Sequence, residues 1–219
     1  MTWRYCRRSS GGGEDFTSTG RFRTAVYKAD ISCRTVKLSG NPEKLLVREA
    51  HGVDFLIMGK KSVPEGPGKV ASHVLRQTLR HATRPVLCIC EVDGKTWSTA
   101  PVLVAYDGSP QAARTLQIFQ AIGLGRGRDI HLLMATSYSE DQHTVELAAE
   151  YLKAYDYRVH VHFQPSSLPA EEIILTEARR HAGLIVMGAY GLSPIKELIF
   201  GSVTRAVLKD SKLPVFLYH

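Results

Sequence analysis

The chain has 219 residues, 44% hydrophobic and 22% charged, a balance typical of a globular protein with one large domain or two small ones. No apolar run approaches the roughly 20 residues of a membrane span, and the N-terminal MTWRYCRRSSGGGED lacks the apolar stretch of a secretory signal. These features argue against a membrane protein or a secreted one, and we expect a cytoplasmic location.

The formal net charge of +7 is unevenly distributed along the chain. Residues 1–100 carry 17 Lys and Arg against 9 Asp and Glu, whereas residues 101–219 carry 11 against 12. Residues 1–33 contain Arg4, Arg7, Arg8, Arg21 and Arg23 and are rich in Arg, Gly and Ser. Because no nucleic-acid recognition motif appears, we expect a solvated basic segment rather than contact with nucleic acid.

Residues 34–97 show a short alternation of strands and helices. In chain order we expect a strand at 34–40, a helix at 41–50, a strand at 56–59, a helix around 74–79 and a strand at 85–90. Cys88 and Cys90 share one face of the last strand. We expect buried thiols there, because this spacing suits neither a disulfide nor a complete zinc site.

Residues 98–219 show a longer alternation. We expect strands at 101–106, 129–136, 158–163, 183–188 and 214–218, and helices at 110–124, 140–155 and 169–182 and after Gly201. Ser109 followed by Pro110 is the signature of a helix start. This order predicts an α/β fold with a doubly wound, Rossmann-like parallel sheet of five strands, covered by helices on both faces.

The two parts of the chain resemble each other at an offset of 129 residues. LIMG at 56–59 aligns with IVMG at 185–188, and Pro85 aligns with Pro214. The first part has no equivalent of the opening strand, helix and strand. We therefore expect a tandem repeat with an incomplete first copy: an atypical segment at 1–33, a partial domain at 34–97 and a complete domain at 98–219.

The second part contains a glycine ladder, Gly188-x2-Gly191-x9-Gly201-Ser202. The first glycine ends an apolar strand, and the Gly-Ser pair opens a helix. Glycines let an anion approach the backbone closely, and a helix start offers unpaired N–H groups. The ladder lacks the Lys of a Walker P-loop. It predicts phosphate binding, with a purely structural strand end and turn as the alternative.

Asp107 ends the first strand of the second part. In a doubly wound sheet the first and fourth strands are neighbours where the winding reverses, and ligands bind at their carboxyl ends. We therefore expect Asp107 and Gly188 to face one crevice, with the carboxylate available to ribose hydroxyls or to an adenine amine. The alternative is an aspartate that serves only the turn.

Together, AYDGS at 105–109, the glycine ladder and the closing PVFLY resemble the universal stress protein family in its ATP-binding subclass. The resemblance covers residues 101–219, and residues 34–92 resemble the back half of a second such domain, as in the tandem form. It implies bound ATP, with or without Mg²⁺, and leaves ADP, AMP or a cyclic nucleotide open. By position, the implied contacts are Ala105, Asp107, Ala135, Gly188, Gly191, Leu192, Ser193, Gly201, Ser202, Val203 and Thr204.

The first copy departs from this pattern. Ser62 stands where the second glycine would be, and Ser72-His73 replaces the Gly-Ser pair. The imidazole of His73 adds bulk where a phosphate would approach. We therefore expect one nucleotide per chain, held by the second copy.

No catalytic constellation appears, so the leading hypothesis is a regulatory stress-response protein with little or no ATP hydrolysis. The alternatives are a slow ATPase that uses Asp107 or Glu197, and a dimeric interaction scaffold with a vestigial nucleotide pocket. The apolar strands PVFLY and PVLCI favour a homodimer paired through them.

His160 and His162 share one face of an expected edge strand. No third metal ligand is evident beside them, and residues such as His181 are scattered in the sequence.

Overall fold

The structure is a computed structural model that describes residues 2–7, 28, 30, 34–60, 73–89, 97, 99–136, 141–189 and 201–219. Its elements are β1 (Thr2–Arg7), β2 (Arg34–Ser39), α2 (Pro42–Ala50), β3 (Leu56–Gly59), α3 (His73–His81), β4 (Val86–Ile89), β5 (Val102–Ala105), α5 (Pro110–Ile122), β6 (Asp129–Thr136), α6 (Gln142–Lys153), β7 (Arg158–Pro165), α7 (Ala170–His181), β8 (Leu184–Gly188), α8 (Ser202–Asp210) and β9 (Val215–Tyr218). Among these residues, no helix has the length and apolarity needed to cross a membrane.

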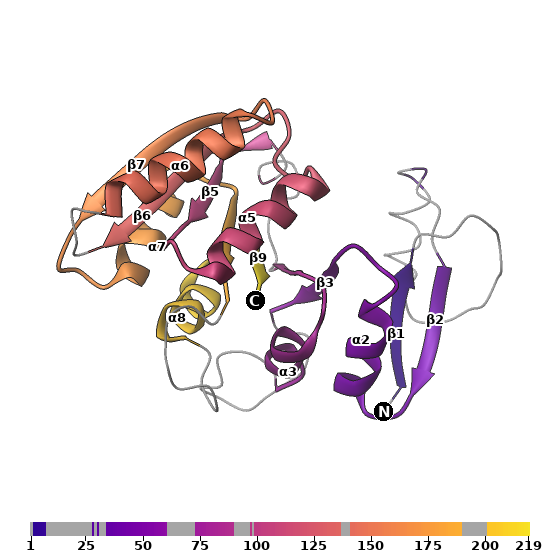
Figure 1. Ribbon diagram of the computed structural model, residues 1–219. Coiled ribbons are helices and arrows are strands. Elements are labelled where there is room, and N and C mark those ends of the chain that lie inside the picture. The colour runs from indigo at the N-terminus through magenta and orange to yellow at the C-terminus, as the bar shows by residue number, and fades with distance from the viewer. Residues whose placement is uncertain are drawn as a thin grey trace.

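A seven-stranded sheet in the order β3-β4-β9-β8-β5-β6-β7 forms the centre of the protein (Figure 1). The predicted number of five strands was wrong for this sheet, because β3 and β4 extend the five strands of residues 98–219. β4 runs antiparallel to β9, with Val86 opposite Leu217 and Cys88 opposite Val215. The other neighbouring pairs of this sheet are parallel.

The β4–β9 pair contradicts the expected dimer interface. The sequence predicts that these strands, within PVLCI and PVFLY, pair between subunits, but here they pair within one chain. The second edge of β9 is occupied by β8, and the second edge of β4 by β3. Neither strand therefore offers a free edge to another subunit, and the prediction of a dimer through these strands is corrected.

Helices cover both faces of the sheet. Side chains of α5 and α6 pack with one set of strand residues, including Phe216, in one apolar core. Side chains of α3, α7 and α8 pack with the alternate set, including Leu217, in a second core. Strands covered on both sides carry apolar residues at successive positions, as Leu184, Ile185 and Val186 do with no exposure. The predicted doubly wound α/β architecture is confirmed.

The N-terminal elements lie apart from the main sheet. β2 covers most of the strand predicted at 34–40, but it pairs antiparallel with β1, from Thr2 opposite Ser39 to Arg7 opposite Arg34. Figure 1 shows this two-stranded sheet with α2 beside it. Part of the segment predicted as a basic arm is thus a strand.

Candidate functional site

Three neighbouring parallel strands end at the same edge of the sheet. β5 lies between β8 and β6, with Ala105 opposite Met187 on one side and Leu133 on the other. The chain winds from β5 to β6 and β7 in one direction, and β8 and β9 lie in the other, so the winding reverses between β5 and β8. Open α/β sheets bind ligands in the crevice at such a reversal. The structure brings the predicted residues Ala105, Ala135 and Gly188 to this edge.

Asp107 follows β5 and is exposed. Its Oδ1 accepts the backbone N–H of Ser109 at 3.0 Å, and the Ser109 Oγ accepts the backbone N–H of Ala112 at 3.1 Å as the cap of α5. Gly108 between them has a φ of 73°, a conformation that glycine adopts without strain. Asp107 therefore stabilises the turn between β5 and α5, as the alternative interpretation predicted. A role toward ribose or adenine stays a prediction.

Gly188 ends β8 where the strand meets the start of α5. A Cβ at this position would lie 2.8 Å from the backbone nitrogen of Ala112 and 3.0 Å from the carbonyl carbon of Gln111. Both neighbours are backbone atoms of α5, so they cannot rotate away as a side chain could. Packing alone therefore requires a glycine at the first step of the ladder.

Gly201 precedes α8 and differs from Gly188 in this respect. Its φ is −48°, which any residue can adopt. A Cβ there would meet no described atom nearer than the Thr204 Oγ1, at 3.9 Å. No side chain of the described residues caps the helix start at Gly201. Within the described part of the chain, neither backbone strain nor crowding explains this glycine, and the space beside it is open at a helix N-terminus.

The remaining predicted contacts divide into two groups. Ser202 is exposed at the first position of α8, Val203 is partly buried, and Thr204 is 4% exposed. The others lie outside the described residues, as does Glu197 of the alternative ATPase; they are Gly191, Leu192 and Ser193.

Residues 99–219, more than half of the chain, match the model of the universal stress protein family. The chain belongs to the universal stress protein family. Universal stress protein Slr1230 of Synechocystis is 28% identical over 170 residues, which cover 75% of this chain and 58% of that protein. Universal stress protein MJ0531 of Methanocaldococcus jannaschii is 23% identical over 112 residues, covering 51% and 65%. This chain thus spans less than two thirds of the length of either relative.

The fold of a solved universal stress protein from Archaeoglobus fulgidus is similar to that of this chain. The two superpose with a TM-score of 0.73 at 23% sequence identity, over 90% of this chain and 73% of the other. At this identity the similarity establishes the Rossmann-like α/β fold of the universal stress proteins and nothing further.

In this universal stress protein, the equivalent positions of the first part have different surroundings. Lys60, next to the strand-ending Gly59, directs its Nζ to the carbonyl oxygens of Ser211 and Leu213, each at 2.9 Å. The His73 Nε2 lies 2.9 Å from the Glu43 Oε1. Ser62 and Ser72 lie outside the described residues. In the first part, Lys60 and His73 thus make contacts within the protein.

Proposed function

We propose that this protein is a nucleotide-binding regulator of the ATP-binding subclass and tandem form of the family. It holds one adenine nucleotide per chain at the carboxyl ends of β5, β6 and β8, and hydrolyses it slowly or not at all. ATP, with or without Mg²⁺, is the proposed ligand; ADP, AMP and a cyclic nucleotide are separated from it by the test below.

The glycine at the start of α8 carries this proposal. The φ of −48° at Gly201 suits any residue, and a Cβ there would lie no closer than 3.9 Å to any described atom. Neither backbone strain nor crowding by the described residues therefore requires a glycine. A glycine in such a place is explained by close approach of a group from outside the protein. The first N–H groups of a helix lack intrahelical partners and carry partial positive charge, so a phosphate is the group that suits this place.

The proposed contacts divide by the part of the nucleotide they serve. Ala105, Asp107 and Ala135 line the adenosine end, and Ala135 offers its backbone to the base. The phosphate contacts are Gly188, Gly191, Gly201 and Ser202, with Leu192, Ser193, Val203 and Thr204 beside them.

The first test is to denature freshly purified protein and to identify and count any released nucleotide by mass spectrometry. We expect about one adenine nucleotide per chain, and its ATP-to-ADP ratio separates a sensor from a hydrolase. Gly201→Ala should weaken Mg-ATP binding by at least about tenfold, or about 1.4 kcal/mol, because its Cβ fills the open space. Lys209→Ala, at the far end of α8, is the matched control and should bind normally.

Two results would reject this function in favour of the alternatives. Magnesium-dependent turnover that Asp107→Ala abolishes, while binding survives, indicates the ATPase. Absence of released nucleotide, together with no thermal shift on adding Mg-ATP, indicates an interaction scaffold whose glycines are structural.

The order of strands and helices in residues 34–97 and 98–219 supports the proposed tandem organisation. β3, α3 and β4 repeat the strand–helix–strand order of β8, α8 and β9, with a parallel strand pair in each. Among the described residues, no strand pairs with the outer edge of β3, whereas β8 has β5 beside it. Ile57 of β3 is 59% exposed, and Val186 at the equivalent position of β8 is fully buried.

We propose that a second subunit covers this outer edge of β3 in a homodimer. Sedimentation should show a dimer at micromolar concentration, which Ile57→Lys weakens by placing a charge in the apolar contact. A stable monomer at that concentration would exclude this interface.

A further inference from the structure

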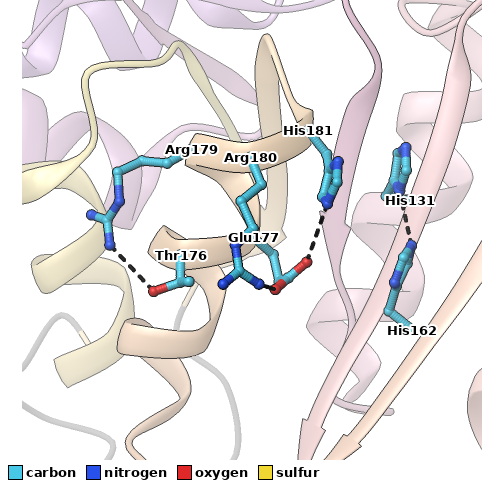
Figure 2. A network of polar contacts seen from close by, with 7 residues as sticks. All are labelled: His131, His162, Thr176, Glu177, Arg179, Arg180 and His181. Atoms are coloured by element: carbon cyan, nitrogen blue, oxygen red, sulfur yellow. Dashed lines mark hydrogen bonds and ion pairs between the residues drawn. The ribbon is translucent and has the colours of Figure 1, made fainter.

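Four histidines from three elements meet near the outer edge of the sheet; we call His131, His160, His162 and His181 the histidine cluster. His131 on β6 lies opposite His160 on β7. The centroid of its ring lies 5.2 Å from that of His160, 5.0 Å from that of His162 and 5.3 Å from that of His181 at the end of α7. His131 is therefore the central ring. Figure 2 shows its ring beside those of His162 and His181.

A hydrogen bond between two imidazoles ties β6 to β7 within the cluster. The Nδ1 of His131 and the Nε2 of His162 are 2.8 Å apart (Figure 2). Between neutral rings, one nitrogen donates and the other accepts. If the accepting nitrogen takes up a proton, two N–H groups face each other and the bond is lost. This contact is therefore incompatible with two doubly protonated rings.

The charged groups around the cluster already balance one another. On β6, the Asp129 Oδ1 accepts the Nε–H of Arg158 of β7 at 2.7 Å. On α7, the largely buried Glu177 accepts an N–H of Arg180 at 3.0 Å. The same two carboxylates each lie 3.8 Å from a ring nitrogen of the cluster. Two carboxylates thus face two guanidinium groups, and every proton added to the rings leaves an uncompensated positive charge.

Burial and crowding make the inner rings poor proton acceptors. Burial lowers the pKa of His131, and its neighbours His162, His160 and His181 lower it further. Burial also lowers the pKa of His162, against the opposing influence of Glu177. The unfolded chain, with a histidine pKa of about 6.5, therefore binds protons more readily than the folded one. The stability that the histidine cluster contributes to the folded protein is present above about pH 6.5 and is lost as the pH falls below that value.

We propose that the histidine cluster is a proton-sensitive device that loosens the outer strand β7 when the surroundings become acidic. β7 is the last strand of the sheet and pairs with β6 on its inner side, so it can loosen while the central strands stay paired. No three or more His, Cys, Asp or Glu side chains of the described residues are placed to hold a metal ion, and the proton response requires none. This response is independent of the proposed nucleotide site.

Hydrogen exchange measured by mass spectrometry tests this proposal directly on the whole chain, with a chelator present. Protection of the amides of 158–165 is compared at about pH 7.5 and about pH 5.5, after correction for intrinsic exchange, with 184–188 in the centre of the sheet as the internal reference. We expect the protection of β7 to fall about tenfold more than that of β8. An equal loss in both strands would overturn the proposal.

Two variants and a control make the test specific. His131→Gln removes the central ring and should abolish the extra loss of protection in β7 at acidic pH. His181→Gln changes an exposed ring and should reduce the extra loss, which keeps the test valid if the first variant folds poorly. His143→Gln, exposed on α6, should behave as the unmodified protein does. A full acid response in both cluster variants would also overturn the proposal.

Discussion

Leu87 on β4 and Phe216 on β9 are register partners across the antiparallel pair that joins the two parts of the sheet. Both are buried, with 3% and no exposure. The Phe216 ring also meets Phe55 before β3 and Phe119 of α5, at centroid distances of 6.5 Å and 6.2 Å. One aromatic ring therefore connects residues 34–97 to the core of residues 98–219, and the junction is part of a continuous apolar core.

Phe216→Ala should consequently destabilise both parts together. We expect the free energy of unfolding to fall by about 3–5 kcal/mol, the usual range when a buried phenylalanine leaves a cavity. Urea unfolding followed by fluorescence and by circular dichroism would measure this loss. Leu168→Ala, which truncates a side chain that is 59% exposed, is the control and should change stability by less than about 0.5 kcal/mol. A loss below about 1 kcal/mol in the Phe216 variant would contradict the packing described.

Gly188 and Gly201, two of the three glycines of the ladder, should respond differently to alanine. Gly188→Ala places a Cβ 2.8 Å from the backbone nitrogen of Ala112, and we expect it to lower stability by about 1–3 kcal/mol. Gly201→Ala meets no such obstacle and should change stability by less than about 0.5 kcal/mol. The midpoints of denaturant unfolding, measured without nucleotide, compare the two. Equal destabilisation would mean that Gly201 is also structural, which would remove the basis of the proposed phosphate site.

Elements with a local signature were predicted from the sequence. Ser109 before Pro110 marks the start of α5, and the apolar run before Gly188 marks β8. The β5–β8 pair was also predicted, from the doubly wound pattern. The partners of β1 and β4 were not predicted, because pairing depends on which backbone edges remain open after folding. The missed strand Thr2–Arg7 and the β4–β9 pair both follow from such non-local pairing.

The candidate site shows the same division between local and non-local information. The ladder could be located in the sequence, but not the packing that makes Gly188 obligatory and leaves Gly201 unexplained, since both depend on atoms of other elements. The histidine cluster gave no signal beyond the alternation of His160 and His162. His131 and His181 join these rings only because β6 and α7 lie beside β7 in the folded chain.

Arg128 should prove important for stability, although it lies just before β6 rather than in the core. It is 7% exposed, and its guanidinium donates to the carbonyl oxygens of Ala100, Trp97 and Pro101, the last two at 2.9 Å and 3.3 Å. Burial lowers the pKa of this guanidinium, which nonetheless stays charged. Arg128→Ala removes the side-chain donor of these carbonyls, of which Pro101 keeps the backbone N–H of Gly183. We expect a loss of at least about 2 kcal/mol in denaturant unfolding.

The variant Arg128→Lys separates the contribution of the positive charge from that of the guanidinium geometry. Arg128→Lys should recover only part of the loss, because an ammonium group lacks the planar fork that reaches several carbonyls at once. Arg179→Ala, exposed on α7, serves as the control and should cost less than about 0.5 kcal/mol. Full recovery by lysine would show that the positive charge alone matters at this position.

Cys88 should be chemically inert in the folded protein. It lies in β4 with no exposure, and burial raises the pKa of its thiol to about 12, although nearby Lys60 acts in the opposite direction. The thiolate is the reactive form, so at about pH 8 almost none of the native thiol can attack a reagent. We expect iodoacetamide to leave Cys88 unmodified in the native protein and to modify it fully in urea, with fragment-ion mass spectrometry distinguishing it from Cys90. Modification at the native and denatured rates alike would mean that the β4–β9 pair opens readily, and the continuous sheet would then be wrong at that junction.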